Sequence, residues 1–130
     1  MNEQCILIVD SDILVRNPLA QYLRECGYRV LEAANEEEAR QVFTDGKQAI
    51  DVLLIDAKSS EEIGFELAGW VRNNYPEVEV VLAGSIAKAV KKAGDICNES
   101  PVDTKPHDYH AVHDRIRSLL AARERNRKKS

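Results

Sequence analysis

The sequence lacks any long hydrophobic run. No stretch approaches the roughly twenty apolar residues that a membrane-spanning helix requires. The first apolar run, Cys5–Val9, is too short for the core of a signal peptide and leads directly into acidic residues. We therefore expect a cytoplasmic protein that does not associate with a membrane.

A strong excess of either charge is also absent. The chain has 18 Lys and Arg residues against 22 Asp and Glu residues, for a formal net charge of -4. This balance argues against attraction of the whole protein to nucleic acid or to a membrane surface. Basic residues crowd only the C-terminal end. We expect residues 1–122 to form one domain, with a basic tail or the start of a linker at 123–130.

Cysteine is scarce, and its spacing carries no motif. The three cysteines are Cys5, Cys26 and Cys97, an odd number without any Cys-x-x-Cys pair. We therefore expect them to be small buried apolar groups in a reducing cytoplasm.

Short β-branched runs recur along the chain and predict strands. Two of them are apolar throughout, as expected of parallel strands that are covered on both faces. A third run is bounded by polar residues, a fourth resembles an edge strand, and the last is the weakest. In chain order the five predicted strands are Cys5–Val9, Tyr28–Ala34, Val52–Ile55, Val78–Ala83 and Pro101–Thr104.

Amphipathic patterns between and after these runs predict five helices. The first closes at Gly27, and Pro18 leaves two starts open: near Ile13, or at Pro18 itself with Asn17 as its cap. The alternation of strands and helices with short connections predicts an α/β fold. Its core is a doubly wound, five-stranded parallel sheet, (βα)5, with helices on both faces.

Ligands of such folds bind at the carboxyl ends of the strands. Asp10 and Asp12 follow the first predicted strand, Asp56 the third, Ser85 the fourth and Lys105 the fifth. Carboxylates that lie close together repel one another, and a bound magnesium ion with oxygen ligands usually offsets this repulsion. An aspartate can then act as a nucleophile toward a phosphoryl group, while a lysine neutralises the phosphoryl oxygens.

Three motifs at these strand ends together resemble the receiver domain of bacterial response regulators. They are ILIVD ending at Asp10, LID ending at Asp56, and the pair Lys105-Pro106, and the resemblance covers about Cys5 to Leu120. It implies the flavodoxin-like strand order 2-1-3-4-5. It also implies phosphoryl transfer to Asp56 from a histidine kinase, a phosphotransfer protein or a small phosphodonor.

The resemblance also assigns roles to individual residues. Asp10, Asp56 and the backbone carbonyl of Lys58 would hold magnesium, and Lys105 would contact the phosphoryl group. Such a domain is not an enzyme, beyond its own phosphorylation and dephosphorylation. It signals through a downstream protein or a fused output domain, and we expect no nucleic-acid partner for this domain alone. The oligomeric state is left open, a dimer included.

The chain departs from the family pattern at several positions. Ser11 replaces the second of two adjacent acids, so we expect weak magnesium binding; Asp12 either takes its place or caps the first helix. The family's strand-four hydroxyl falls on Gly84, with Ser85 one residue late as a phosphate contact or a helix cap. The family's switch aromatic falls on Val102.

These departures leave two functional interpretations. In the first, Asp56 is phosphorylated and the output mechanism is unconventional. In the second, the domain is a pseudo-receiver, which binds a protein partner without phosphorylation through the fourth helix, fifth strand and fifth helix. A flavin- or nucleotide-binding flavodoxin-like protein is disfavoured, because the loop after the first strand is acidic rather than rich in Gly, Ser or Thr.

Overall fold

The computed structural model of the chain describes residues 4–56, 61–83, 85–98 and 109–128. The predicted strand Pro101–Thr104 therefore lies outside the described residues, as do Lys58, Gly84 and Lys105. Within the described ranges, four strands and five helices follow one another. They are β1 (Cys5–Val9), α1 (Ile13–Glu25), β2 (Arg29–Ala33), α2 (Glu36–Asp45), β3 (Val52–Asp56), α3 (Glu61–Asn74), β4 (Glu79–Ala83), α4 (Ile86–Asn98) and α5 (Tyr109–Lys128).

The strands form one parallel sheet in the order β2-β1-β3-β4. This confirms the predicted parallel sheet, and it confirms the predicted order as far as β4. Val9 of β1 pairs with both Ala33 of β2 and Ile55 of β3, so β1 and β2 end level and β3 ends one residue further. β3 runs one residue further than predicted, and its last residue, Asp56, pairs with Ala83 of β4.

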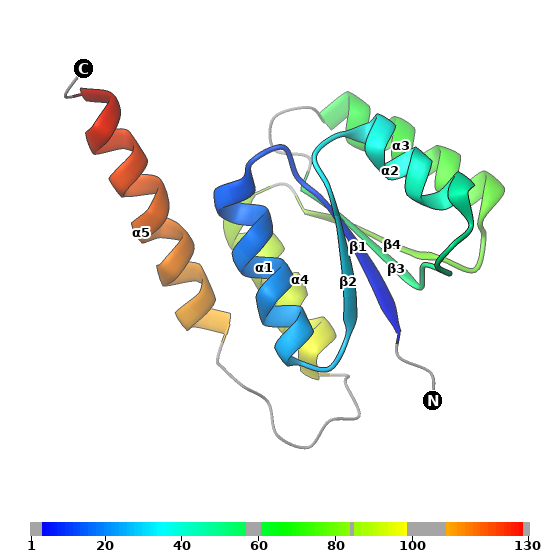
Figure 1. Cartoon of the computed structure of the whole chain (residues 1–130), viewed down its shortest axis with the longest axis horizontal. Helices are drawn as coiled ribbons and strands as arrows, with labels where there is room; N and C mark the ends of the chain where they lie inside the picture. Colours follow the sequence, from blue (N-terminus) through cyan, green and yellow to red (C-terminus); the bar gives the residue numbers. More distant parts are fainter. Residues whose placement is uncertain (1–3, 57–60, 84, 99–108, 129–130) are drawn as a thin grey trace.

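Helices cover both faces of the sheet, as predicted. In Figure 1, α1 and α4 lie on one face, and α2 and α3 lie on the other. Side chains of β1 alternate between the two cores: Ile6 and Ile8 pack with α1 and α4, while Leu7 and Val9 pack with α2 and α3. This explains why β1 is apolar at every position, since both of its faces are buried.

The N-terminus of α1 decides between its two predicted starts. Asp12 is the N-cap, because its side chain accepts a hydrogen bond from the backbone N–H of Leu14. The helix therefore begins at Ile13, and Pro18 lies inside it. Proline removes one backbone donor there, but Pro18 is buried against the core.

Gly27 closes α1 as predicted. Its φ of 100° lies in the region that favours glycine, directly after the C-cap Cys26. The N–H of Gly27 donates to the carbonyl of Arg24 at 3.0 Å, and the N–H of Tyr28 donates to Leu23 at 3.2 Å. This pair of bonds is a Schellman motif, which directs the chain from the end of α1 straight into β2.

α5 continues past the predicted end of the domain. It runs unbroken to Lys128, so residues 123–128 of the predicted tail are helical. It contacts α1 and α4 and buries Val112 and Ile116 in the core that they share. The role of residues 123–130 as a tail or a linker stays a prediction. None of the helices in the described part of the chain is both long and apolar enough to cross a membrane.

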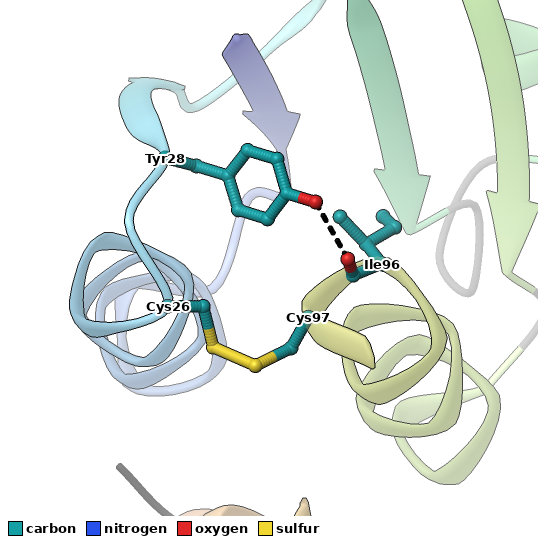
Figure 2. Close-up of a disulfide and its surroundings, with 4 residues drawn as sticks. All are labelled: Cys26, Tyr28, Ile96 and Cys97. Carbon is teal, nitrogen blue, oxygen red and sulfur yellow. Dashed lines mark hydrogen bonds between the residues drawn. A yellow bond between two sulfur atoms is a disulfide. The ribbon is translucent and has the colours of Figure 1, made fainter. Parts of the chain in front are cut away.

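The expectation that all three cysteines are buried apolar groups in a reducing environment is wrong for two of them, which are bonded to each other. Cys26 and Cys97 form a disulfide with a Cα–Cα distance of 5.5 Å (Figure 2). They lie 71 residues apart in sequence, and only the docking of α4 beside α1 brings them together. The prediction of burial is confirmed for all three, and Cys5 is a free buried thiol as expected.

Candidate functional site

Two predicted acids lie at neighbouring strand ends. Val9 of β1 pairs with Ile55 of β3, and the next residue on each strand is an aspartate, Asp10 and Asp56 respectively. Ala83, the last residue of β4, pairs with Asp56 on the other side. The sheet therefore brings the ends of β1, β3 and β4 to one edge, with an acid on the first two.

Asp10 is a buried acid at this edge, only 5% exposed. Its backbone N–H donates to the carbonyl of Ala33 at 3.1 Å, which extends the pairing of β1 with β2 by one residue. Its Oδ1 accepts a hydrogen bond from the N–H of Asp12 at 2.9 Å. A buried carboxylate is costly unless hydrogen bonds or positive charge stabilise it, and Asp10 lies at the edge of the sheet where folds of this kind bind ligands.

Arg16 brings positive charge to the same strand end, and sequence reasoning missed it. Its Nη1 donates to the carbonyl oxygen of Asp10 at 2.8 Å, and its Nε pairs with Oε1 of Glu32 at 3.0 Å. Arg24 completes the group, with its Nη2 3.4 Å from the other Glu32 oxygen. The only sequence signal was the position of Arg16 one helical turn after Asp12, on the side that faces back toward β1.

Asp12 caps α1, the helix that follows β1 and Asp10. Its Oδ1 accepts the hydrogen bond from the N–H of Leu14 at 3.0 Å. Of the two roles considered for Asp12, the structure therefore contains the helix cap. Its role as a substitute magnesium ligand stays a prediction, and taking that role would compete with the cap.

Ser85 has a similar function at the start of α4. Its Oγ accepts a hydrogen bond from the N–H of Lys88 at 3.1 Å, and its carbonyl accepts one from Ala89 at 2.9 Å. The hydroxyl is therefore engaged as a helix cap. A contact between Ser85 and a phosphoryl group stays a prediction.

The roles of the remaining predicted site residues stay predictions. Asp56 is described in its backbone alone, and Lys58, Gly84, Val102 and Lys105 lie outside the described residues. In the part of the chain that the structure describes, no group of three or more His, Cys, Asp or Glu side chains forms a metal site. The predicted magnesium ligands include Asp56 and the carbonyl of Lys58, which this group could not contain.

Comparison with known proteins identifies a family. The model of the response regulator receiver domain matches residues 6–117. The phosphate regulon transcriptional regulatory protein PhoB of Pseudomonas aeruginosa is 34% identical over 118 residues, which cover 88% of this chain and 51% of that protein. A cyclic di-GMP phosphodiesterase of Thermotoga maritima is 32% identical over 100 residues, 75% of this chain and 25% of that protein. The chain thus spans about half or less of these relatives.

Solved structures agree with this match. The response regulator TrrA of Thermotoga maritima, solved in complex with Mg2+ and BeF, is 30% identical with a TM-score of 0.55, over 61% of this chain and 67% of that one. The receiver domain of an HD domain-containing protein from Pseudomonas fluorescens has a TM-score of 0.58 over 100% of this chain and 96% of that one. At 22% identity, the second likeness shows the fold alone.

Proposed function

Because the chain belongs to the response regulator receiver family, we propose that it accepts a phosphoryl group on Asp56 within a phosphorelay. The observation that carries this proposal is the register of β1 and β3, in which Asp10 and Asp56 follow the paired residues Val9 and Ile55. Carboxylates at adjacent strand ends supply both a nucleophile and a cation ligand at the edge where such folds bind ligands.

The proposed chemistry is a single displacement at phosphorus. A carboxylate oxygen of Asp56 attacks the phosphoryl group of a kinase phosphohistidine or of a small acyl phosphate. The bond to the donor nitrogen or oxygen breaks, and the donor leaves with the electron pair, while Asp56 becomes an aspartyl phosphate. Lys105 would neutralise the phosphoryl oxygens as a point charge. The domain is itself modified and turns over no separate substrate, so it is not an enzyme in the usual sense.

The proposed oxygen ligands suit magnesium, but they should bind it weakly. Asp10 is a buried acid with hard oxygen donors at the strand edge, and Asp56 and the carbonyl of Lys58 would complete the protein ligands. Magnesium, when bound, supplies positive charge to the carboxylates and the phosphoryl oxygens. Ser11 contributes no carboxylate, and the carboxylate of Asp12 is engaged at the helix cap. We therefore expect low affinity.

A second function, a pseudo-receiver, is favoured by the same two residues. A site with Ser11 in place of an acid and with Asp12 engaged as a cap has one fewer free carboxylate for a metal. In this case the domain would bind a protein partner without being phosphorylated. The contact between α4 and α5 supplies two of the three elements of the expected partner surface.

The proposed partners follow from the family and from the length of the relatives. A histidine kinase or phosphotransfer protein would donate the phosphoryl group in the cytoplasm. PhoB is a transcriptional regulator about twice as long as the matched segment, so the present chain would act on a downstream protein or a fused output domain. The helical residues 123–128 would begin the linker to that domain.

Intact mass tests the proposal directly. The protein is incubated with acetyl phosphate and magnesium, and we expect a mass gain equal to one phosphoryl group. The gain should be absent from Asp56→Asn and from a sample with EDTA. It should persist in Asp45→Asn, which changes an exposed acid at the end of α2. Labelling of Asp56→Asn, or none in the wild type, would contradict the proposal.

Ser11→Asp separates a weak receiver from a pseudo-receiver. The added acid should strengthen magnesium binding on the order of tenfold, because ligand charge sets the affinity of such sites. If the wild type is already labelled at high magnesium, Ser11→Asp should only lower the concentration required. If labelling appears in the variant alone, the natural chain is a pseudo-receiver.

A further inference from the structure

A disulfide and an adjacent hydrogen bond join the C-terminal ends of α1 and α4. The disulfide links Cys26, the C-cap of α1, to Cys97 in the last turn of α4. Beside it, the hydroxyl of Tyr28 donates a hydrogen bond to the carbonyl oxygen of Ile96 at 2.7 Å (Figure 2). We call these four residues the α1–α4 clasp. Both links connect positions about half the chain apart, 71 and 68 residues.

The clasp lies at the end of a helix whose last turn also packs against the core through the partly buried Ile96. The last four carbonyls of a helix lack intrahelical partners, and Ile96 is the third residue from the end of α4, so Tyr28 satisfies one of them. The described side chains that α4 buries are small: Ala89, Val90, Ala93 and Cys97. Because hydrophobic stabilisation grows with the apolar area buried, the disulfide adds a covalent link to a modest contribution from these side chains.

The opposite ends of the same two helices lie at the candidate site. Asp12, the N-cap of α1, lies two residues after the buried acid Asp10, and Ser85, the cap of α4, lies two residues after the end of β4. Residue Ala83 at that strand end pairs with Asp56. The clasp therefore joins, at their far ends, the two helices that start from the acidic edge.

From this arrangement we infer that Cys26 and Cys97 form a reversible redox site, whose state decides whether the C-terminal end of α4 is held against α1. Disulfides in reducing compartments are usually transient and redox-sensing. The reversibility therefore rests on the cytoplasmic location proposed above. The disulfide and the phosphoacceptor are separate sites, so each can be tested without the other.

Reduction would consume two molecules of a small thiol such as glutathione. The thiolate of the first attacks one of the two sulfurs; the Sγ–Sγ bond breaks, and the other cysteine leaves as a thiolate and takes a proton from water. The second thiolate attacks the glutathione sulfur of the mixed disulfide. The remaining cysteine leaves and is protonated, and glutathione disulfide is released. The protein gains two electrons and two protons, and glutathione disulfide reverses the reaction.

Burial of both sulfurs controls the access of an attacking thiolate to the disulfide. Cys26 is 0% exposed and Cys97 is 1% exposed, so a thiolate reaches neither sulfur in the closed state. The ends of α1 and α4 must first separate, and the Tyr28–Ile96 hydrogen bond opposes that separation. The rate of reduction therefore reports the opening of the clasp.

A glutathione titration of the folded protein tests the inference. The protein is equilibrated with mixtures of reduced and oxidised glutathione, free thiols are alkylated, and peptides containing Cys26 and Cys97 are compared with the peptide containing Cys5. We expect a disulfide that is reduced and re-formed within this range. A disulfide that never forms, or one that resists glutathione until the protein unfolds, would overturn the inference, because a purely structural bridge resists the glutathione pool.

Hydrogen exchange then tests the consequence for α4. Reduction should speed amide exchange in residues 86–98 by about tenfold or more, while exchange in α3, on the opposite face of the sheet, stays unchanged. Equal exchange of α4 in the two redox states would overturn the inference. Labelling by acetyl phosphate is read separately by mass, so failure of the redox site is distinguishable from failure of the proposed function.

Two matched tyrosine variants test whether opening of the α1–α4 clasp controls the rate of disulfide reduction. Tyr28→Phe removes the hydroxyl that binds Ile96 and should speed reduction roughly fivefold, the equivalent of one lost hydrogen bond. Tyr75→Phe removes the corresponding bond to the carbonyl of Phe43 on the other face of the sheet and should leave the rate unchanged. Equal rates for both variants would contradict the role assigned to the clasp.

Discussion

The guanidinium of Arg16 lies against the backbone of Asp10, with Nη1 2.8 Å from the carbonyl oxygen. The same side chain pairs with Glu32 of β2 at 3.0 Å. Arg16 thus ties the first turn of α1 to the ends of β1 and β2, next to the buried acid. The two side chains are 13% and 21% exposed, so water screens their attraction only in part.

Replacement of Arg16 tests this link. Arg16→Gln should lower the free energy of unfolding by about 1–2 kcal/mol, because two hydrogen bonds to a charged donor are lost from a partly buried position. Urea denaturation measures the change. The exposed Arg72 near the end of α3 is the matched control, and Arg72→Gln should cost less than about 0.5 kcal/mol. Equal costs for the two variants would contradict the role of Arg16.

Asp12 offers a test that separates a helix cap from a metal ligand. Asp12→Ala should destabilise the protein by about 1 kcal/mol, whereas Asp12→Ser, which retains a capping oxygen, should cost only a few tenths. Thermal or urea unfolding gives both values.

Magnesium titration by calorimetry supplies the second readout on Asp12. If Asp12 acts only as a cap, Asp12→Ser leaves the magnesium affinity unchanged. A loss of affinity in Asp12→Ser without loss of stability would assign the carboxylate to the metal instead.

Local patterns predicted the parts of the fold that local forces determine. β1 was predicted with its bounds, because a run that is apolar at every position fits a strand buried on both faces. The ends of α2 are equally local, since the Asn35 side chain accepts from the N–H of Glu38 and Gly46 adopts a φ of 63°. In each case neighbouring residues along the chain contained the physical cause.

Features that depend on tertiary packing left no comparable signal. The pairing of Cys26 with Cys97 requires α4 to lie beside α1, and nothing in the spacing of three cysteines indicates this. The contact between Arg16 and the carbonyl of Asp10 depends on how α1 leaves β1. By contrast, the positions of Asp10 and Asp56 could be placed at one edge from sequence, because parallel strands always end on the same side of a sheet.

Loss of the disulfide should reduce stability substantially. The bridge closes a loop of 71 residues, for which the chain-entropy model gives up to about 4 kcal/mol of stabilisation relative to the reduced unfolded chain. Cys26→Ser and Cys97→Ser should each lower the free energy of unfolding of the oxidised protein toward that of the reduced wild type. Urea denaturation with and without reductant measures both, and Cys5→Ser is the control that leaves the bridge intact. Equal stability of the oxidised and reduced wild type would contradict this expectation.

Cys5 should make the stability of the protein depend on pH in alkaline solution. Burial raises the pKa of its thiol above the ordinary value of 9.0, and the nearby carboxylate of Asp51 adds to the increase, although Arg29 lowers it in part. The folded state therefore keeps its proton at a pH where the unfolded chain has lost it. This contribution to stability is complete below pH 9.0 and is lost as the pH rises through the pKa of the folded state.

Comparison with Cys5→Ala isolates this contribution. Above pH 9.0, the wild type should lose stability relative to the variant, with a slope of at most about 1.4 kcal/mol per pH unit. Urea denaturation of the oxidised proteins across that range measures the slope, because the sulfurs of Cys26 and Cys97 do not titrate while they are bridged. Parallel pH profiles for the two proteins would mean that Cys5 ionises equally in both states, which a thiol only 1% exposed cannot do without opening β1 to water.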